Sequence, residues 1–286
     1  MKQLILHLLL LLFPLQLFAF VEVRDGVFYL NDTPWRALGV NISTTTSNKQ
    51  AFHEAAKFGC NSLRVTPTSI KQLRNMVKWA KSENIKLYVV VNADIQIEKL
   101  KSFKKKREIW AWEVENSEIA KKLKSICPNH LVSITSDNQF NDLNTRIDQI
   151  KFSQYIDFLA IPLLPIENKW VAPSNLYLGL RNAYLKTDQL MQAIAHRMYP
   201  SIKPIVVSEC SYPRDKMFRL PESQTSSRDS YFSFVMNYAL PNEERKINGV
   251  YFNIWELHPE EDNDSHLSTY SIYPSDSTTQ QIIIQQ

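Results

Sequence analysis

Glycine is scarce in this chain of 286 residues, with five copies at positions 26, 39, 59, 179 and 249. This is about 2% of the residues, where roughly 7% is typical. No two glycines stand close enough to form a Gly-rich phosphate loop, so neither the dinucleotide-binding fingerprint nor a P-loop occurs in the sequence. Nucleotide-driven chemistry is therefore not expected, and the sequence predicts no cofactor.

Cysteine and metal-ligand patterns are equally sparse. Cys60, Cys127 and Cys210 cannot all pair with one another, so we do not expect a disulfide framework to hold the protein together. The histidines lack metal-ligand spacing such as HExxH, and no G-x-S-x-G motif for a serine hydrolase exists. The acidic run at 260–264 could hold calcium, but a solvated loop is the simpler interpretation. No metal site is predicted.

Neither sign of charge dominates the chain. Lys and Arg number 33 against 29 Asp and Glu, and this formal net charge of +4 is too mild and too dispersed to indicate nucleic acid as a partner. One dense basic run stands at 101–107 (KSFKKKR), and a solvated helix face is its simpler interpretation. With 44% hydrophobic and 22% charged residues, the composition is that of a globular protein and excludes a disordered or collagen-like chain.

A long hydrophobic run occurs at the N-terminus. Lys2 followed by the apolar run 4–18 has the layout of a secretory signal peptide, with cleavage expected after Ala19. The run is short for a membrane span, which needs about 20 apolar residues, although an uncleaved anchor remains the alternative. We therefore expect residues 1–19 to be a signal peptide and the mature chain 20–286 to be a secreted or periplasmic monomer, without a stable membrane span after processing.

The mature chain alternates short apolar runs of strand length with amphipathic stretches of helical spacing. Eight such strands predict a (β/α)8 TIM barrel in a single domain, and a doubly wound open sheet is the alternative. Residues 21–35, with a turn at Asn31-Asp32, are expected to form a short N-terminal β-hairpin that closes the bottom of the barrel. The expected strands are 37–42, 62–65, 87–91, 109–114, 131–135, 158–164, 204–208 and 249–254, and the expected helices are 49–58, 70–82, 95–105, 118–126, 187–196 and 228–238.

Polar residues end several of the expected strands. In a (β/α)8 barrel the carboxyl ends of the strands meet at one mouth, where such enzymes carry their chemistry. Asn41 ends the first strand and Arg64 lies in the second, while Glu209 follows the apolar run 205–207 of the seventh. A carboxylate at the end of a buried strand serves no packing purpose, because an unpaired buried charge costs several kcal/mol. Glu209 is therefore the strongest candidate for a functional carboxylate.

Four segments resemble, in order, the glycoside hydrolases of clan A, the retaining (β/α)8 enzymes that cleave β-linked sugars. Residues 27–41 are similar to the opening of family 5 enzymes, and 61–65 to their arginine segment on the second strand. Residues 203–213 are closer to the nucleophile segment of family 17, the β-1,3-glucanases and related transglycosidases, although Ser211 stands where that family has Gly. Residues 157–165 resemble the sixth strand of bacterial members. The resemblance implies that Glu209 is the catalytic nucleophile.

The resemblance to clan A does not extend to the residue that serves as general acid in those enzymes. Clan A enzymes carry an Asn-Glu pair after the fourth barrel strand, and this chain has Asn116-Ser117 there. A retaining glycosidase needs a second carboxyl group about 5 to 5.5 Å from the nucleophile, and serine cannot replace it. Glu118 is our candidate for a displaced acid, although the helix dipole by itself explains an acidic residue in a first turn. Further candidates are Glu115, Glu167 and Glu256.

The resemblance also implies a set of substrate contacts. Arg64 would support the nucleophile, Asn116 would donate to the sugar 2-hydroxyl, and Trp255 would form a stacking floor, with packing in the barrel as the alternative for the tryptophan. Ser117 and Tyr212 complete the expected binding residues.

Two functions remain open at this stage. The chain is an enzyme that acts on a β-linked polysaccharide or oligosaccharide, such as a β-glucan, or it is an impaired homologue that binds glycan without cleaving it.

Overall fold

The computed structural model describes residues 19–43, 47–93, 95–134, 143–201, 203–239, 247–258 and 269–284. Except for Ala19, the expected signal peptide lies outside the described residues. The acidic run at 260–264 lies outside them as well, so its suggested calcium site is not tested.

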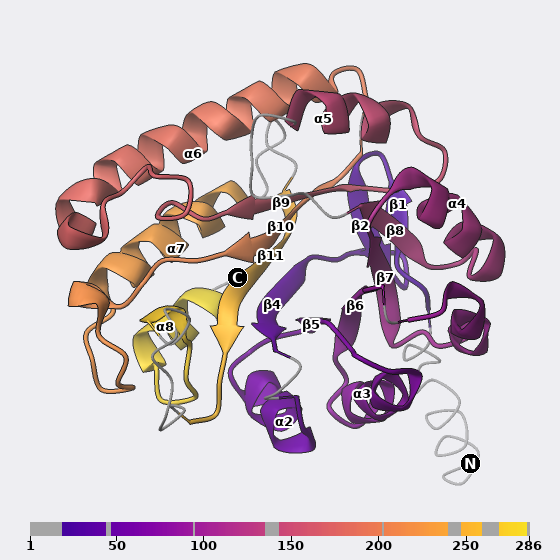
Figure 1. Cartoon of the computed structure of the whole chain (residues 1–286), viewed down its shortest axis with the longest axis horizontal. Coiled ribbons are helices and arrows are strands. Elements are labelled where there is room, and N and C mark those ends of the chain that lie inside the picture. Colours follow the sequence, from indigo (N-terminus) through magenta and orange to yellow (C-terminus); the bar gives the residue numbers. More distant parts are fainter. Residues whose placement is uncertain are drawn as a thin grey trace, which may run out of the picture.

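Eight parallel strands form the barrel, with helices on its outside (Figure 1). The strand order is β8-β7-β6-β5-β4-β11-β10-β9, so β4, the first strand of the barrel, pairs with β11, the last. At the remaining seam the backbone N–H of Asp157, just before β9, donates to the carbonyl of Val132 in β8 at 2.8 Å. The predicted (β/α)8 barrel is confirmed. The strands are β4 (Ala37–Ile42), β5 (Ser62–Val65), β6 (Lys86–Val90), β7 (Ile109–Val114), β8 (Leu131–Ile134), β9 (Leu159–Leu163), β10 (Ile205–Cys210) and β11 (Ile247–Trp255).

The helices follow the predicted alternation with three differences. The stretch expected at 95–105 is a 3₁₀ helix, α6 begins eleven residues before the expected 187, and α5 and α8 are additional. Leu176 and Leu180 are buried in the first half of α6 while Tyr177 and Leu178 between them are exposed, which hides the helical period in the sequence. The helices are α2 (Lys49–Lys57), α3 (Ile70–Ser82), α4 (Ser117–Ile126), α5 (Leu143–Phe152), α6 (Leu176–Met198), α7 (Ser226–Ala239) and α8 (Ser277–Ile284), with 3₁₀ helices η1 (Ile97–Phe103), η3 (Pro173–Asn175) and η4 (Asp215–Met217).

The N-terminal segment closes the bottom of the barrel, as predicted. It forms β1 (Glu22–Arg24), β2 (Val27–Leu30) and β3 (Thr33–Pro34), which pair antiparallel. Phe28 of β2 packs edge-on against Trp110 of β7 and Phe158 before β9, with ring centroids 5.1 and 5.6 Å apart. These aromatic rings belong to a buried cluster inside the lower half of the barrel. The polar residues at the opposite ends of the strands are thereby left at the single open mouth.

A second and larger core lies between the strands and the surrounding helices. All three cysteines are buried free thiols, so the protein holds together without a disulfide, as expected. In the described residues no helix is long and apolar enough to cross a membrane. Those residues also contain no cluster of His, Cys, Asp and Glu side chains that could hold a metal ion.

His130, between α4 and β8, makes the stability of the fold sensitive to acid. The side chain is fully buried, and its Nε2 donates to the carbonyl of Lys106 at 2.9 Å. Burial lowers the pKa of His130 to about 4, while an exposed histidine titrates near 6.5. The unfolded chain therefore binds more protons between these values, so stability is full above about pH 6.5 and falls as the pH approaches 4.

We expect the wild type to lose roughly 2 to 3 kcal/mol more stability between pH 7 and 4.5 than His130→Gln, which keeps a donor for Lys106 without titrating. Urea unfolding at the two pH values measures the difference. The exposed His196→Gln serves as the matched control and should behave as wild type. Equal losses in wild type and His130→Gln would contradict this role of His130.

Candidate active site

Glu209 lies near the end of β10, at the mouth of the barrel, with its side chain 30% exposed. The pairing of β10 shifts register after Val207 against both neighbouring strands. A bulge of this kind re-aims side chains and often occurs beside active sites. The strand therefore presents one accessible carboxylate at the position that the sequence predicted.

Arg64 of β5 joins two carboxylates at the centre of the mouth. Its Nη1 donates to Oε1 of Glu209 at 2.9 Å, while Nε and Nη2 donate to the two oxygens of Glu113 at 2.9 and 2.8 Å. Burial alone would lower the pKa of Arg64, but the two carboxylates outweigh burial and raise it well above its usual value. Arg64 is therefore a permanent cation that holds one oxygen of Glu209 in place.

Two asparagines complete the support of Glu209. Nη1 of Arg64 also donates to Oδ1 of Asn41 at 3.0 Å, and Nδ2 of Asn41 donates to the carbonyl of Ser208 at 3.1 Å and to Oδ1 of Asn253. Nδ2 of Asn253 donates to Oε2 of Glu209 at 3.4 Å. Both oxygens of Glu209 thus accept hydrogen bonds, which fixes the orientation of the carboxylate.

Glu113, on β7, is a second carboxylate at this site that the sequence analysis did not single out. It is 1% exposed, and both of its oxygens accept from Arg64 in a bidentate pair. A buried carboxylate in such a pair stays charged, because removing either partner leaves the other unpaired at a cost of several kcal/mol. Glu113 therefore orients Arg64 and is unsuited to donate a proton to a leaving group. A charged residue inside the apolar run 109–114 was the signal that could have identified it.

Asn116, Ser117 and Glu118 form the start of α4. Asn116 is exposed and caps the helix, its Oδ1 accepting from the backbone N–H groups of Glu118 and Ile119 at 3.1 and 3.0 Å. The cap occupies the side-chain oxygen, so Nδ2 is the group of Asn116 that would donate to a sugar hydroxyl. Ser117 is the first helical residue, and Glu118 is exposed in the first turn, the position that the helix dipole favours for an acidic residue.

The structure gives Trp255 and Tyr212 packing roles in place of the expected sugar contacts. Trp255 is fully buried on the helix side of β11, where its indole N–H donates to the carbonyl of Ala51 at 3.1 Å and its ring packs edge-on against Phe58. Tyr212 is fully buried, and its hydroxyl donates to the carbonyl of Leu176 at 2.7 Å. The expectation that a sugar stacks on Trp255 is therefore wrong. The indole faces α2 and not the mouth, so Trp255 packs inside the fold.

The remaining acidic candidates differ in their surroundings. Glu256 is buried, and its Oε2 accepts from the hydroxyl of Ser271 at 2.6 Å. Glu115 and Glu167 are exposed. Among the aromatic residues of the loops at this end of the barrel, Phe218 is 53% exposed.

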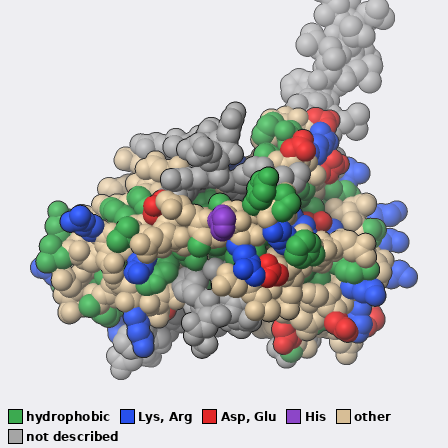
Figure 2. All heavy atoms as spheres, turned by 90° about the horizontal axis from the view of Figure 1, so that it is seen from above, with side chains coloured by type: hydrophobic (Ala, Val, Ile, Leu, Met, Phe, Trp, Pro, Cys, Tyr) green, Lys and Arg blue, Asp and Glu red, His purple; other side chains and the backbone are tan. Residues whose placement is uncertain are grey.

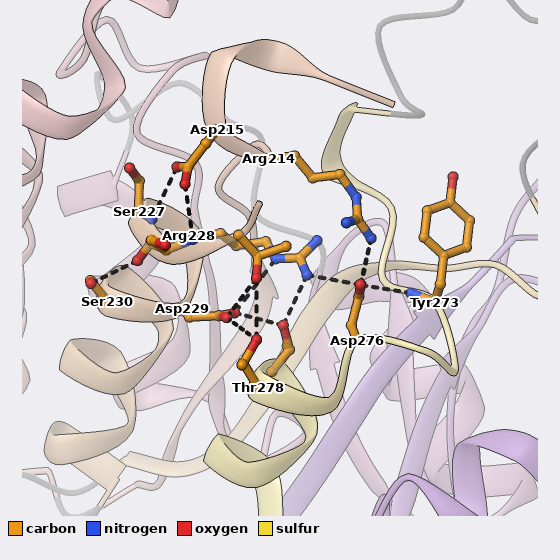
Figure 3. Close-up of polar contacts among 12 residues, drawn as sticks. Arg214, Asp215, Ser227, Arg228, Asp229, Ser230, Tyr273, Asp276 and Thr278 are labelled. Atoms are coloured by element: carbon orange, nitrogen blue, oxygen red, sulfur yellow. Dashed lines mark hydrogen bonds and ion pairs between the residues drawn. The ribbon is translucent and has the colours of Figure 1, made fainter. Parts of the chain in front are cut away.

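The chain that follows β10 is anchored by a buried ionic network (Figure 3). Arg214 and Arg228 are fully buried and both donate to Asp276, at 2.6 and 2.9 Å to the same oxygen. Asp215 accepts from the backbone N–H groups of Ser226 and Ser227 at the start of α7. The network ties the loop after Glu209 to α7 and to the C-terminal segment, which holds this rim of the mouth in place.

A model of one glycoside hydrolase family matches residues 28–258 of this chain, and its description is glycoside hydrolase family 5 β-mannosidase-like. The matched range contains Arg64, Glu113 and Glu209. The chain belongs to glycoside hydrolase family 5. The resemblance to clan A is thereby confirmed, and the segment 203–213, which is similar to family 17, lies inside a family 5 protein.

Solved structures of family 5 glycosidases share the fold of this family 5 protein. A family 5 mannosidase from Rhizomucor miehei has a TM-score of 0.77 at 16% identity, covering 94% of this chain and 96% of that one. A mutant of that mannosidase in complex with mannosyl-fructose has a TM-score of 0.75 at 16% identity, covering 93% and 96%. An endo-1,4-β-D-mannanase from Thermotoga petrophila has a TM-score of 0.59 at 16% identity, covering 88% and 99%. Among curated proteins, none matches this sequence significantly.

Proposed function

We propose that this family 5 protein binds a β-linked glycan at the mouth of the barrel and that Glu209 is the nucleophile of a retaining glycosidase reaction. The observation that carries the proposal is the half-buried carboxylate of Glu209, held by Arg64 and Asn253 at the carboxyl end of β10. A carboxylate that is fixed in orientation and still accessible can attack an anomeric carbon. The similarity to mannosidases makes a β-mannoside the first substrate to test, followed by a β-glucan.

The missing acid limits the leaving groups that this site can expel. Glu113 is bound by Arg64 on both oxygens, and Ser117 stands where the resemblance expects the acid. Loss of general acid catalysis slows a reaction roughly 10²- to 10⁴-fold. We therefore propose slow turnover of polysaccharide and normal attack on sugars whose leaving group needs no proton. Glu118 remains the candidate for a displaced acid. Export from the cell, with residues 1–19 as the leader, is part of the same proposal.

A glycan-binding protein without turnover is the second candidate. Arg64, Asn41 and Asn253 would retain polar contacts to a sugar even if no bond were broken, and Phe218 would offer an exposed ring. The substitution at Ser117 favours this candidate over a fully active enzyme.

Affinity electrophoresis and reducing-end release distinguish the candidates. We expect wild type and Glu209→Gln to be retarded about equally in gels that contain β-mannan, because the nucleophile contributes more to the transition state than to ground-state binding. Slow release of reducing ends should occur with wild type and be absent with Glu209→Gln. If the wild type is retarded in the gel but releases no reducing ends, the result favours the glycan-binding protein. Absence of retardation in mannan, glucan and xylan gels would contradict both candidates.

A further inference from the structure

A basic face lies on the outside of the barrel between α3 and η1. Two adjoining grooves of about 440 and 570 Å³ run along it, and Lys106 lines both. Lys and Arg side chains also gather along the right-hand edge of the molecule in Figure 2, the side on which α4 lies in Figure 1. We define the basic face by six exposed residues of these grooves, Lys71, Arg74, Lys78, Lys104, Lys105 and Lys106.

The basic face is not explained by the stability of the fold. Within the described residues no carboxylate forms an ion pair with any of the six, and Glu108 is the one acidic residue that lines either groove. Lys71, Arg74 and Lys78 stand three and four residues apart on α3, where like charges repel and destabilise a helix. A counter-charge from outside the chain would remove this repulsion.

The described chain begins at the basic face. Nζ of Lys86 donates to the carbonyl of Ala19 at 3.3 Å, and the guanidinium of Arg107 lies 5.7 Å from the ring of Phe20. Phe20 also lines the larger groove. The apolar run 4–18 therefore joins the barrel at this face. Two residues span at most roughly 7 Å, which is less than the Debye length of about 8 Å at physiological ionic strength.

We propose that, in the form of the chain that keeps the apolar run as an uncleaved anchor, the alternative to cleavage after Ala19, the basic face docks on the anionic phospholipid surface beside that anchor. The two signals are neighbours, because Phe20, two residues after the run, lines the same groove as Lys104, Lys105 and Lys106. A short apolar anchor gives weak and reversible binding, and a polybasic patch next to it makes attachment stable. Lys86 is the first residue of β6, while Glu209 lies at the carboxyl end of β10. The basic face lies on the outside of the barrel and contains none of the residues that surround Glu209, so this proposal does not depend on the proposed function.

Vesicle sedimentation of the full chain tests the docking. We measure the partition coefficient on phosphatidylglycerol/phosphatidylcholine vesicles and divide it by the coefficient on pure phosphatidylcholine vesicles. Insertion of the apolar run contributes equally to both coefficients, so their ratio reports the preference for anionic lipid. Each basic residue near an anionic surface contributes roughly fivefold. The triple variant Lys78→Gln, Lys105→Gln and Lys106→Gln should therefore lower the ratio on the order of 100-fold.

A matched triple variant removes the same charge elsewhere. Lys49→Gln, Lys169→Gln and Lys186→Gln change exposed lysines outside the basic face and should leave the ratio close to that of wild type. A wild-type ratio near one, or equal ratios for the two triple variants, would overturn the proposal. Binding to soluble polyphosphate with no preference for anionic vesicles would also overturn it, since the face would then serve a soluble polyanion.

Discussion

A dinitrophenyl β-mannoside is expected to label the wild-type protein covalently at Glu209, although the same protein cleaves β-mannan very slowly. Glu209 attacks the anomeric carbon, and the bond to the phenolic oxygen breaks with both electrons leaving on the phenolate, which needs no proton. A sugar leaving group needs that proton, and its absence slows cleavage roughly 10²- to 10⁴-fold. Hydrolysis of the adduct also needs a base to activate water, so the labelled protein should accumulate. Intact-mass measurement detects the added hexosyl unit, and peptide mapping locates it.

Azide and Glu209→Gln are the controls for this experiment. Azide needs no base, so it should attack the anomeric carbon of the adduct, displace the carboxylate of Glu209 and shorten the lifetime of the labelled protein. Glu209→Gln should abolish both the label and the effect of azide. Rapid hydrolysis of mannan by the wild type would show that an acid exists elsewhere, whereas absence of any label from both the mannoside and the corresponding glucoside would leave only glycan binding.

Introducing a carboxyl group with Ser117→Glu is expected to raise the rate of polysaccharide cleavage roughly 10²- to 10⁴-fold, because it returns a general acid to the place where clan A enzymes carry theirs. The substitution suits the local fold. Ser117 is the first residue of α4, with Asn116 as the cap, and an acidic side chain in a first turn is favoured by the helix dipole. Reducing-end release from β-mannan and β-glucan measures the gain.

Ser117→Gln is the matched control for that gain, since it has the same size and no titratable proton. Its rate should stay near that of wild type, while Ser117→Glu combined with Glu209→Gln should be inactive. The pH profile of Ser117→Glu should also acquire an acidic limb and a basic limb, one for the nucleophile and one for the new acid. A rate no higher than that of Ser117→Gln would show that the site cannot use an acid there.

Strand positions were predictable because each barrel strand is buried on both faces and stands out as a short apolar run. The expected strands 37–42, 62–65 and 109–114 match β4, β5 and β7 residue for residue. Helix α6 was predicted at less than half its length, because its exposed Tyr177 and Leu178 mimic a core-facing pattern. Alternation by itself did not distinguish the predicted closed barrel from the open sheet, since the order of strands and helices is the same in both.

The sequence by itself determined the alternation of strands and helices, the carboxylate Glu209 and the presence of Ser117 where the resemblance expects an acid. Each of these depends on residue type and order alone. Only the tertiary structure decided which polar residues meet. Arg64, Glu113 and Glu209 are far apart in the chain and come together because parallel strands place their carboxyl ends at one mouth. It also decided which way Trp255 faces, because a bulge or register shift of one residue exchanges the two faces of a strand.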